Sequence, residues 1–327
     1  MPEWCSAWRA RDERLSTKSW RRTRVSRRAA GQSMASFSTT RCRATSRTAT
    51  VPTIGDGSAS NRRPVRWPRL NPDGPEPPMP AAAKRVIAPV TFEWTVREDA
   101  IRDIVEAVNA KSCRVFAFCN MHTFNLARRS SSLAQALGKA TVFNDGLGID
   151  IASRILFGSK FPENLNGTDL TPALLARFGQ PVSIYLVGSA PGVAESAAEA
   201  LATRFPAVTI AGCQHGFFDA SEDNRVADEI RAANADLVLV GMGNPRQELW
   251  ATNISERAGA VVLCVGAYID FAAGRFSRAP AWVRRLRCEW AYRLVLEPSR
   301  MWRRYFGGAP PFLLSVLSEK RRQPRSG

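Results

Sequence analysis

Asp145 is the acidic residue whose sequence surroundings best suit a role in catalysis. It follows an apolar run that ends at Asn144, and it precedes Gly146. A glycine beside a carboxylate lets another molecule come close to the chain, and loops at strand ends often carry functional side chains. A carboxylate held there could accept a proton from a hydroxyl group as that group attacks another molecule. The alternative is an aspartate that only caps the helix after it.

Three further segments combine polar side chains with small residues. They are Gly167-Thr168-Asp169, Asn244-Pro245-Arg246-Gln247-Glu248 and the segment from Asp270 to Arg275. If each follows a strand of one parallel sheet, all lie along the edge that also carries Asp145, where ligands of such sheets bind. The candidate substrate-binding residues are His122, Asn144, Gly146, Thr168, Asp169, Gly188, Ser189, Gly241, Asn244, Pro245, Glu248, Asp270 and Arg275.

Two glycine turns follow apolar runs and could approach a phosphate group. Gly188 and Ser189 begin a turn that ends at Gly192, where backbone N–H groups at a helix start could bind an anion. The other turn, from Gly241 to Gly243, lacks the third glycine of a dinucleotide-binding fingerprint. The sequence also contains no G-x-x-x-x-G-K-[ST] motif, which disfavours kinase and ATPase chemistry.

No set of metal ligands stands out in the sequence. His122 and His215 are the only histidines, and the seven cysteines include no C-x-x-C pair. No Asp-x-Asp pair follows a strand, so a diphosphate clamp built on a divalent metal is not indicated. We therefore expect neither a metal nor a cofactor. The odd number of cysteines without a disulfide pattern indicates a reduced, cytoplasmic protein.

The elements that would position these residues alternate between short apolar strands and helices. Predicted strands are residues 114–120, 141–144, 182–187, 237–240 and 261–265, and predicted helices are residues 123–137, 149–157 and a stretch that ends at Arg204. Three of the strands stop at a glycine, as is typical where a strand turns tightly into a helix. This order predicts an α/β fold with a Rossmann-like, mainly parallel sheet, helices on both faces and a C-terminal helical appendage.

Charge divides the chain of 327 residues into three parts. Residues 1–80 carry a net charge of +10, residues 81–274 carry −3, and residues 275–327 carry +10. The first part is rich in Arg, Ser, Thr and Pro, which predicts a disordered basic N-terminal extension. The second part is the predicted α/β domain, and the third is a basic appendage. The longest apolar stretch, residues 259–269, is too short to span a bilayer.

The C-terminal appendage contains an amphipathic pattern. An apolar stripe at helical spacing is formed by Trp282, Leu286, Trp290 and Leu294. The basic residues that lie off this stripe are Arg284, Arg285 and Arg287. Basic amphipathic helices with tryptophan bind at membrane surfaces, so the pattern predicts attachment to an anionic membrane. The alternative is that the stripe packs on the core of the protein itself.

Several long motifs in one order resemble the WecB/TagA/CpsF glycosyltransferases, which make bacterial cell-surface polysaccharides and wall teichoic acid. The motifs are NDGLGIDIASRILFG, NGTDL, YLVGS, GMGNPRQE, IDFAAGR, RAPAW and EWAYRLVLEP. The resemblance implies an inverting, metal-independent enzyme that moves a sugar from a UDP-sugar to an undecaprenyl-diphosphate-linked saccharide. It also implies that Asp145 is the general base, Gln247 an active-site glutamine, and Asn120 the asparagine after the first core strand.

Two residues depart from the pattern of that family. Phe118 stands where the family often has Thr, and Asn164 stands where many members have Arg. The Asn-rich sequence around Asn164 is similar to the exopolysaccharide enzymes of the family, so glucose or another hexose fits as well as N-acetylmannosamine. Without a metal, the charge of a leaving UDP needs other donors, for which the backbone of Gly188 and Ser189 and the C-terminal arginines are available.

Two other classes of protein remain compatible with the sequence. A basic nucleic-acid-binding protein would use the same Trp and Arg residues for stacking and phosphate contacts. A nucleotide-dependent oxidoreductase would need the glycine that the fingerprint lacks. The glycosyltransferase interpretation predicts a UDP-sugar, a lipid-linked acceptor and an anionic membrane as partners, without nucleic acid, and it is compatible with a homo-oligomer. It places the protein in the cytoplasm, bound peripherally to the inner face of the cell membrane.

Overall fold

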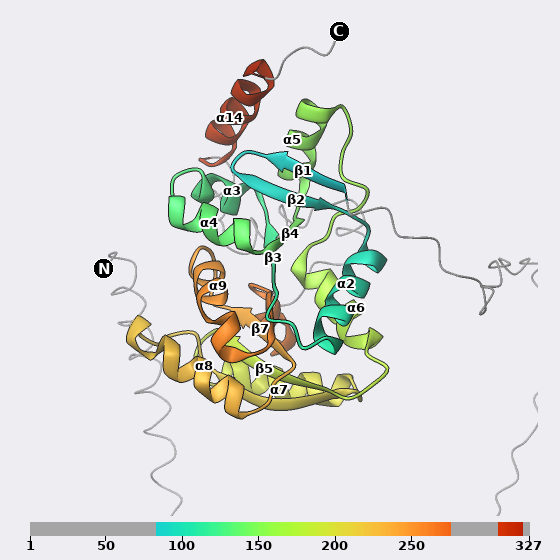
Figure 1. The fold of residues 1–327 in the computed structure, drawn as a ribbon, viewed down its shortest axis with the longest axis vertical. Helices are drawn as coiled ribbons and strands as arrows, with labels where there is room; N and C mark the ends of the chain where they lie inside the picture. The colour runs from blue at the N-terminus through green and yellow to red at the C-terminus, as the bar shows by residue number, and fades with distance from the viewer. Residues whose placement is uncertain (1–82, 276–306, 323–327) are drawn as a thin grey trace, which may run out of the picture. The chain divides into compact units, whose positions relative to one another are not determined.

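The computed structural model describes residues 83–275 and 307–322 of the chain (Figure 1). The predicted N-terminal extension, residues 1–80, lies outside the described residues. So do the predicted membrane-binding residues Trp282, Arg284, Arg285, Leu286, Arg287 and Trp290. Both predictions therefore stay predictions.

A six-stranded parallel sheet forms the centre of the described structure. The strand order is β4-β3-β8-β7-β5-β6, and every neighbouring pair is parallel. The strands are β3 (Val115–Cys119), β4 (Thr141–Asn144), β5 (Val182–Gly188), β6 (Val208–Gln214), β7 (Leu237–Gly241) and β8 (Val261–Cys264). The predicted α/β fold is confirmed, and β6 is a strand that the sequence analysis did not predict.

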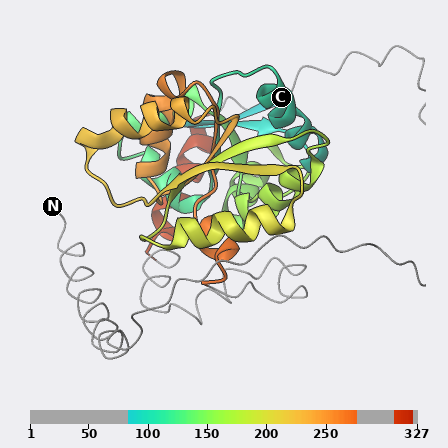
Figure 2. The same ribbon diagram turned by 90° about the horizontal axis from the view of Figure 1, so that it is seen from below.

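Helices cover both faces of the sheet, as Figure 2 shows. One face carries α3 (Met121–Ala127), α4 (Ser131–Lys139), α5 (Leu147–Phe157), α8 (Asp223–Ala232), α9 (Arg246–Ala258) and α14 (Ala309–Arg322). The other face carries α2 (Arg97–Asn109), α6 (Gly167–Arg177), α7 (Val193–Arg204) and α10 (Tyr268–Ala272). A short 3-10 helix, η1 (Ala220–Glu222), precedes α8.

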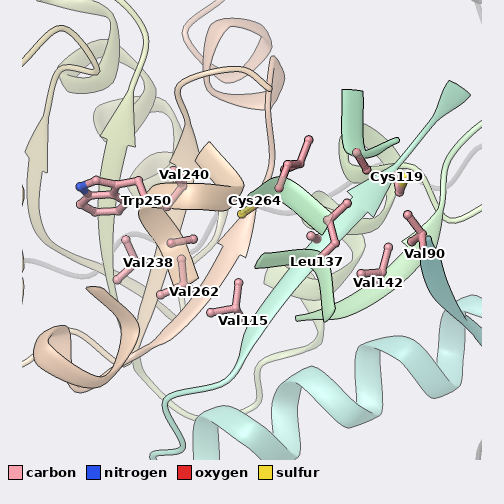
Figure 3. Packing of buried hydrophobic residues seen from close by; sticks show 14 of the residues in the cluster. Val90, Val115, Cys119, Leu137, Val142, Val238, Val240, Trp250, Val262 and Cys264 are labelled. Carbon is pink, nitrogen blue, oxygen red and sulfur yellow. The ribbon is translucent and has the colours of Figure 1, made fainter. Parts of the chain in front are cut away.

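The central strands β3, β7 and β8 are apolar and buried along their whole length because helices cover both of their faces. In β3, Val115, Ala117 and Cys119 belong to one hydrophobic cluster, whereas Phe116 and Phe118 belong to the other. Figure 3 shows the first cluster, in which side chains of β7 and β8 lie between Leu137 of α4 and Trp250 of α9, and Cys119 of β3 lies on the other side of Leu137. The hydrophobic clusters on the two faces of the sheet hold the ends of neighbouring strands in fixed register.

A two-stranded hairpin, β1 (Ala83–Ile87) and β2 (Val90–Trp94), precedes the parallel sheet. Its strands are antiparallel, and Phe92 packs edge-on against Phe161 with ring centroids 5.7 Å apart. Ile87, Val90 and Phe92 are buried in the cluster that also contains Val142 of β4. The sequence analysis did not predict this hairpin, which extends the hydrophobic cluster beside β4.

The predicted helix at residues 123–137 is wrong as a single element. The structure has two helices there, α3 and α4, which are separated at Ser130. Ser130 adopts an extended conformation, and its hydroxyl accepts a hydrogen bond from the N–H of Leu133 at 3.2 Å. A serine that caps a new helix ends the preceding one, although the apolar spacing continues through it.

The last described helix, α14, packs against the α/β domain (Figure 1). The rings of Phe312 and Phe124 meet edge to face with centroids 5.3 Å apart. The Lys320 ammonium donates to the carbonyl oxygen of Leu156 at 2.9 Å, and the Asn125 amide donates to that of Gly308 at 2.8 Å. The described part of the C-terminal appendage thus contributes to the main hydrophobic cluster.

Candidate active site

The polar strand ends gather along the carboxyl edge of the sheet, as the sequence predicted. Asn120 follows β3, Asp145 follows β4, and Gly188 and Gly241 are the last residues of the paired strands β5 and β7. The chain leaves β5 toward β6 but leaves β7 toward β8, so the connections diverge between β5 and β7. Ligands of open α/β sheets bind at such a switch point, at the carboxyl ends of the strands.

Asn120 holds the carboxylate of Asp145 at the start of α3. The Asn120 Oδ1 atom accepts hydrogen bonds from the backbone N–H groups of His122 and Thr123, at 3.0 and 3.2 Å. These bonds cap the helix and turn the Asn120 Nδ2 atom toward Asp145 Oδ2, 3.2 Å away. The cap of the following helix, α5, is Gly146. Asp145 therefore lies one residue before that cap, with its carboxylate bonded to Asn120.

A loop at residues 163–165 braces the glycine turn that follows Asp145. The Gly146 N–H donates to Asn164 Oδ1 at 2.6 Å, and Gly146 has a φ of 87°, which favours glycine. The Asn144 amide donates to the carbonyl oxygen of Glu163 at 3.0 Å. Asn144 is fully buried, so in this structure its side chain supports the loop. Asn164, a departure from the family pattern, takes part in positioning the turn.

Thr168 and Asp169 lie in the first turn of α6. The cap residue, Asn166, accepts hydrogen bonds from the Thr168 hydroxyl at 2.9 Å and from the Asp169 N–H at 2.8 Å. Its amide also donates to Asp169 Oδ2 at 2.8 Å. A Cβ atom on Gly167 would lie 3.0 Å from the Phe118 ring. Phe118 is thus a buried support under the start of α6.

Glycines let three strand-end loops come into contact. A Cβ atom on Gly188 would lie 2.4 Å from the carbonyl oxygen of Gly241, and one on Gly241 would lie 2.5 Å from that of Gly266. The Ser189 N–H donates to the Gly241 carbonyl oxygen at 3.0 Å, so in this structure it is already engaged. Ser189 has a φ of 55°, and its buried hydroxyl has no hydrogen-bond partner within residues 83–275 and 307–322.

The segment after β7 forms a buried polar cluster at the start of α9. Glu248 is 1% exposed, and its Oε1 atom accepts hydrogen bonds from Gln247 Nε2, at 2.8 Å, and from Asn244 Nδ2. Pro245 is the cap residue of α9. Burial raises the pKa of the Glu248 carboxyl to about 7, although these hydrogen bonds act in the opposite direction.

Two buried thiols lie near Glu248, and one of them, Cys119, also lies near Asp145. The pKa of the Cys119 thiol is raised first by burial and then by the charges of Glu248 and Asp145. Burial and the charge of Glu248 also raise the pKa of the Cys264 thiol. The carboxylates of Glu248 and Asp145 therefore act on the same end of β3.

The remaining predicted residues lie on neighbouring elements. Asp270 is on α10 after β8, and Arg275 lies 3.9 Å from its carboxylate, from Nη1 to Oδ1. The loop after β6 carries Phe217, which is 57% exposed, and Gly216, where a Cβ atom would lie 3.1 Å from Gly188 Cα. Phe217 was not among the predicted site residues, because it lies in the loop after β6 and this strand was not predicted.

The described residues contain neither a candidate metal site nor a candidate membrane span. Residues 83–275 and 307–322 contain no group of three His, Cys, Asp or Glu side chains placed to hold a metal ion. In the same residues, no helix is both long and apolar enough to cross a membrane.

A parallel α/β sheet with a switch point binds ligands at its carboxyl edge, and a carboxylate positioned there is suited to proton transfer in an enzyme. Residues 86–326 match the profile described as "Glycosyl transferase WecG/TagA/CpsF family". The match covers most of the chain, which therefore belongs to this glycosyltransferase family. The resemblance seen in the motifs is confirmed.

Two curated relatives carry the same name, N-acetylglucosaminyldiphosphoundecaprenol N-acetyl-beta-D-mannosaminyltransferase. The protein of Bacillus subtilis (strain 168) is 32% identical over 182 residues, which are 55% of this chain and 69% of the relative. The protein of Bacillus spizizenii is 31% identical over the same shares of both chains. The chain is similar to enzymes that, by their name, transfer a sugar to a lipid-diphosphate-linked saccharide.

Proposed function

We propose that this protein transfers a sugar from a UDP-sugar to a lipid-diphosphate-linked saccharide, with inversion at the anomeric carbon and without a metal ion. The single observation that carries the proposal is the Asp145 carboxylate, which Asn120 holds beside the glycine turn at the carboxyl edge. Membership of the glycosyltransferase family and the names of the two relatives support the reaction class.

In the proposed reaction, Asp145 acts as the general base. A sugar hydroxyl is a poor nucleophile near neutral pH, and a carboxylate within hydrogen-bond reach can accept its proton as the new glycosidic bond forms. Such assistance accelerates a reaction by about 10²- to 10⁴-fold. The Asn120 amide nitrogen orients the Asp145 carboxylate, because two backbone N–H groups of α3 hold the amide oxygen of Asn120 in place.

The donor would bind where β5 and β7 end. The first turn of α7 offers N–H groups that have no partner within the helix, and the dipole of a helix favours a diphosphate there. The unpartnered hydroxyl of Ser189 is a further donor beside that turn. This assignment replaces the backbone N–H of Ser189, which the structure shows bonded to Gly241. The aromatic ring of Phe217, which follows Gly216 beside Gly188, would stack on the base of the donor in this proposal.

The identity of the acceptor is inferred from the names of the relatives, and that of the transferred sugar from these names and from Asn164. The relatives' name points to N-acetylmannosamine as the sugar and to an undecaprenyl-diphosphate-linked N-acetylglucosamine as the acceptor. Asn164 bonds Gly146 and stands where many members of the family have Arg, so glucose or another hexose is the second candidate for the sugar. A lipid-linked acceptor also calls for peripheral attachment to the cytoplasmic face of the membrane, to which the appendage at residues 275–327 would contribute its positive charge.

A thermal-shift screen of nucleotides tests the donor class. A ligand at 100 times its dissociation constant adds about 2.7 kcal/mol to the stability of the folded protein. We expect UDP, UDP-N-acetylmannosamine or UDP-glucose to raise the melting temperature, and NAD to leave it unchanged. Stabilisation by NAD without any response to UDP compounds would instead favour an oxidoreductase.

A further inference from the structure

The buried carboxylate of Glu248 is not used by the proposed chemistry, yet it organises the polar side chains around it. Its Oε1 atom accepts two hydrogen bonds, from Gln247 Nε2 and from Asn244 Nδ2. A side-chain amide has a donor end and an acceptor end. When both nitrogen atoms point toward Glu248, both amide oxygens point away from it.

The Oε1 atom of Gln247, which points away from Glu248, has no hydrogen-bond partner in the part of the chain that the structure describes. Gln247 is 3% exposed, and its Oε1 atom is buried without a hydrogen bond. The loop after β8 is adjacent, since a Cβ atom on Gly266 would lie only 3.9 Å from this oxygen. An unpartnered buried acceptor at the carboxyl edge of the sheet is costly unless a ligand satisfies it.

We infer that Glu248 is a positioning residue that fixes the amides of Gln247 and Asn244 so that they present oxygen acceptors to the hydroxyl and N–H groups of the sugar. The inference rests on the proposed function, and it adds that this part of the site presents hydrogen-bond acceptors to the ligand. Carbonyl oxygens can bind donors only, and a diphosphate at neutral pH offers only acceptors. These oxygens therefore do not bind the diphosphate, and in this inference they bind the transferred sugar, while the diphosphate binds toward α7.

The protonation state of Glu248 would modulate this arrangement. An ionised carboxylate accepts hydrogen bonds more strongly than a protonated carboxyl does. Among residues 83–275 and 307–322, the titratable groups that Glu248 affects are the thiols of Cys119 on β3 and Cys264 on β8, and burial keeps the pKa of each well above its ordinary value. The charge of Asp145, which follows β4, also raises the pKa of the Cys119 thiol. Lower pH is thus expected to loosen the two amides.

Two substitutions at residue 248 separate positioning from a merely structural role. Glu248→Gln keeps an acceptor oxygen for both amides, whereas Glu248→Met removes it at similar size. Glu256→Gln and Glu256→Met are matched controls, because Glu256 is exposed on the same helix. Dissociation constants for UDP and for the nucleotide sugar that the wild type binds, UDP-N-acetylmannosamine or UDP-glucose, are measured by calorimetry.

We expect Glu248→Met to weaken binding of the nucleotide sugar by about 10- to 100-fold, and binding of UDP by less than about 2-fold. Glu248→Gln is expected to restore affinity for the sugar donor. Equal loss for both ligands, or no loss for either, would overturn the inference. A wild-type protein that binds neither ligand would instead refute the proposed function.

A pH series keeps the inference testable if Glu248→Met does not fold. The KM of the wild type for the nucleotide sugar should rise as the pH falls from 8 to 6, and that of Glu248→Gln should change less over the same range. Parallel profiles for the two proteins would contradict a role for Glu248 in positioning.

Discussion

A hydrogen bond between two side chains that follow different strands positions the proposed base. Asn120 and Asp145 are 25 positions apart in the sequence, and parallel pairing of β3 with β4 brings them together. The amide oxygen of Asn120 also caps α3, while its amide nitrogen bonds Asp145, so the two atoms have separate roles. A substitution that keeps one task and removes the other can separate them.

Asn120→Ser is that substitution. Serine caps a helix about as well as asparagine, so we expect the free energy of unfolding to change by less than about 0.5 kcal/mol. The serine hydroxyl is too short to reach Asp145, and turnover should fall by about 10- to 100-fold, as misplaced catalytic groups usually cause. Steady-state transfer and urea unfolding measure the two effects. Unchanged turnover would leave Asn120 with capping alone.

Glu248 should make the stability of the folded protein depend on pH. Burial raises its pKa from the ordinary 4.5 to about 7 in the folded chain, so between these values the folded state binds more protons than the unfolded state. Stability from this group is therefore full below about pH 4.5 and is lost as the pH rises through 7, by at most about 3 kcal/mol. This difference should disappear in Glu248→Gln. Thermal unfolding at pH 5 and pH 8, with Glu256→Gln as control, measures it.

At the scale of elements, the carboxyl edge needs glycine where loops touch. Gly241→Ala would place a Cβ atom 2.5 Å from the Gly266 carbonyl oxygen and 2.9 Å from Ile269 Cδ1. We expect a loss of about 1–3 kcal/mol in stability, as overpacking of a close-packed site causes. Gly138→Ala is the matched control, because nothing lies within 4 Å of its position in α4. There alanine should stabilise the helix by about 0.4–1 kcal/mol. Equal effects in chemical unfolding would contradict the contact argument.

The sequence predicted those parts of the fold that depend on local pattern. Each predicted strand is present because an apolar run buried on both faces is distinctive, and this also placed Asn120 and Asp145 at one edge. The break between α3 and α4 was missed because the apolar residues keep a helical spacing on both sides of Ser130. That spacing does not show that Ser130 caps a new helix. The edge strand β6 was missed because most of its residues are only partly buried.

Side-chain partners in the site could not be predicted, because they depend on contacts between distant segments. The Asn164 bond to Gly146 crosses 18 positions, and the Ser189 N–H meets Gly241 on another strand. Glu248 was expected among the substrate-binding residues, and the prediction that it touches substrate stays untested. In the structure it is buried and bonded to Gln247 and Asn244.

At the scale of the whole molecule, the described hydrophobic clusters are built from residues after 86. Deletion of residues 1–80 should therefore leave the melting temperature and the transfer rate close to those of the full chain, since a segment of that composition contributes no core. Differential scanning calorimetry and the transfer assay compare the two forms. Loss of cooperative unfolding in the shortened protein would show that the N-terminal segment takes part in the fold.

In the proposed reaction, Asp145 removes the proton of the acceptor hydroxyl, and the sugar transfer needs no metal ion. The most direct test measures transfer from a UDP-sugar to a soluble diphosphate-linked N-acetylglucosamine acceptor in the presence of EDTA, for the wild type and for Asp145→Asn. We predict product from the wild type, a loss of about 10² or more in turnover for Asp145→Asn, and unchanged affinity of that variant for UDP. Turnover above about a tenth of the wild-type value in Asp145→Asn would contradict the role of Asp145 as the base.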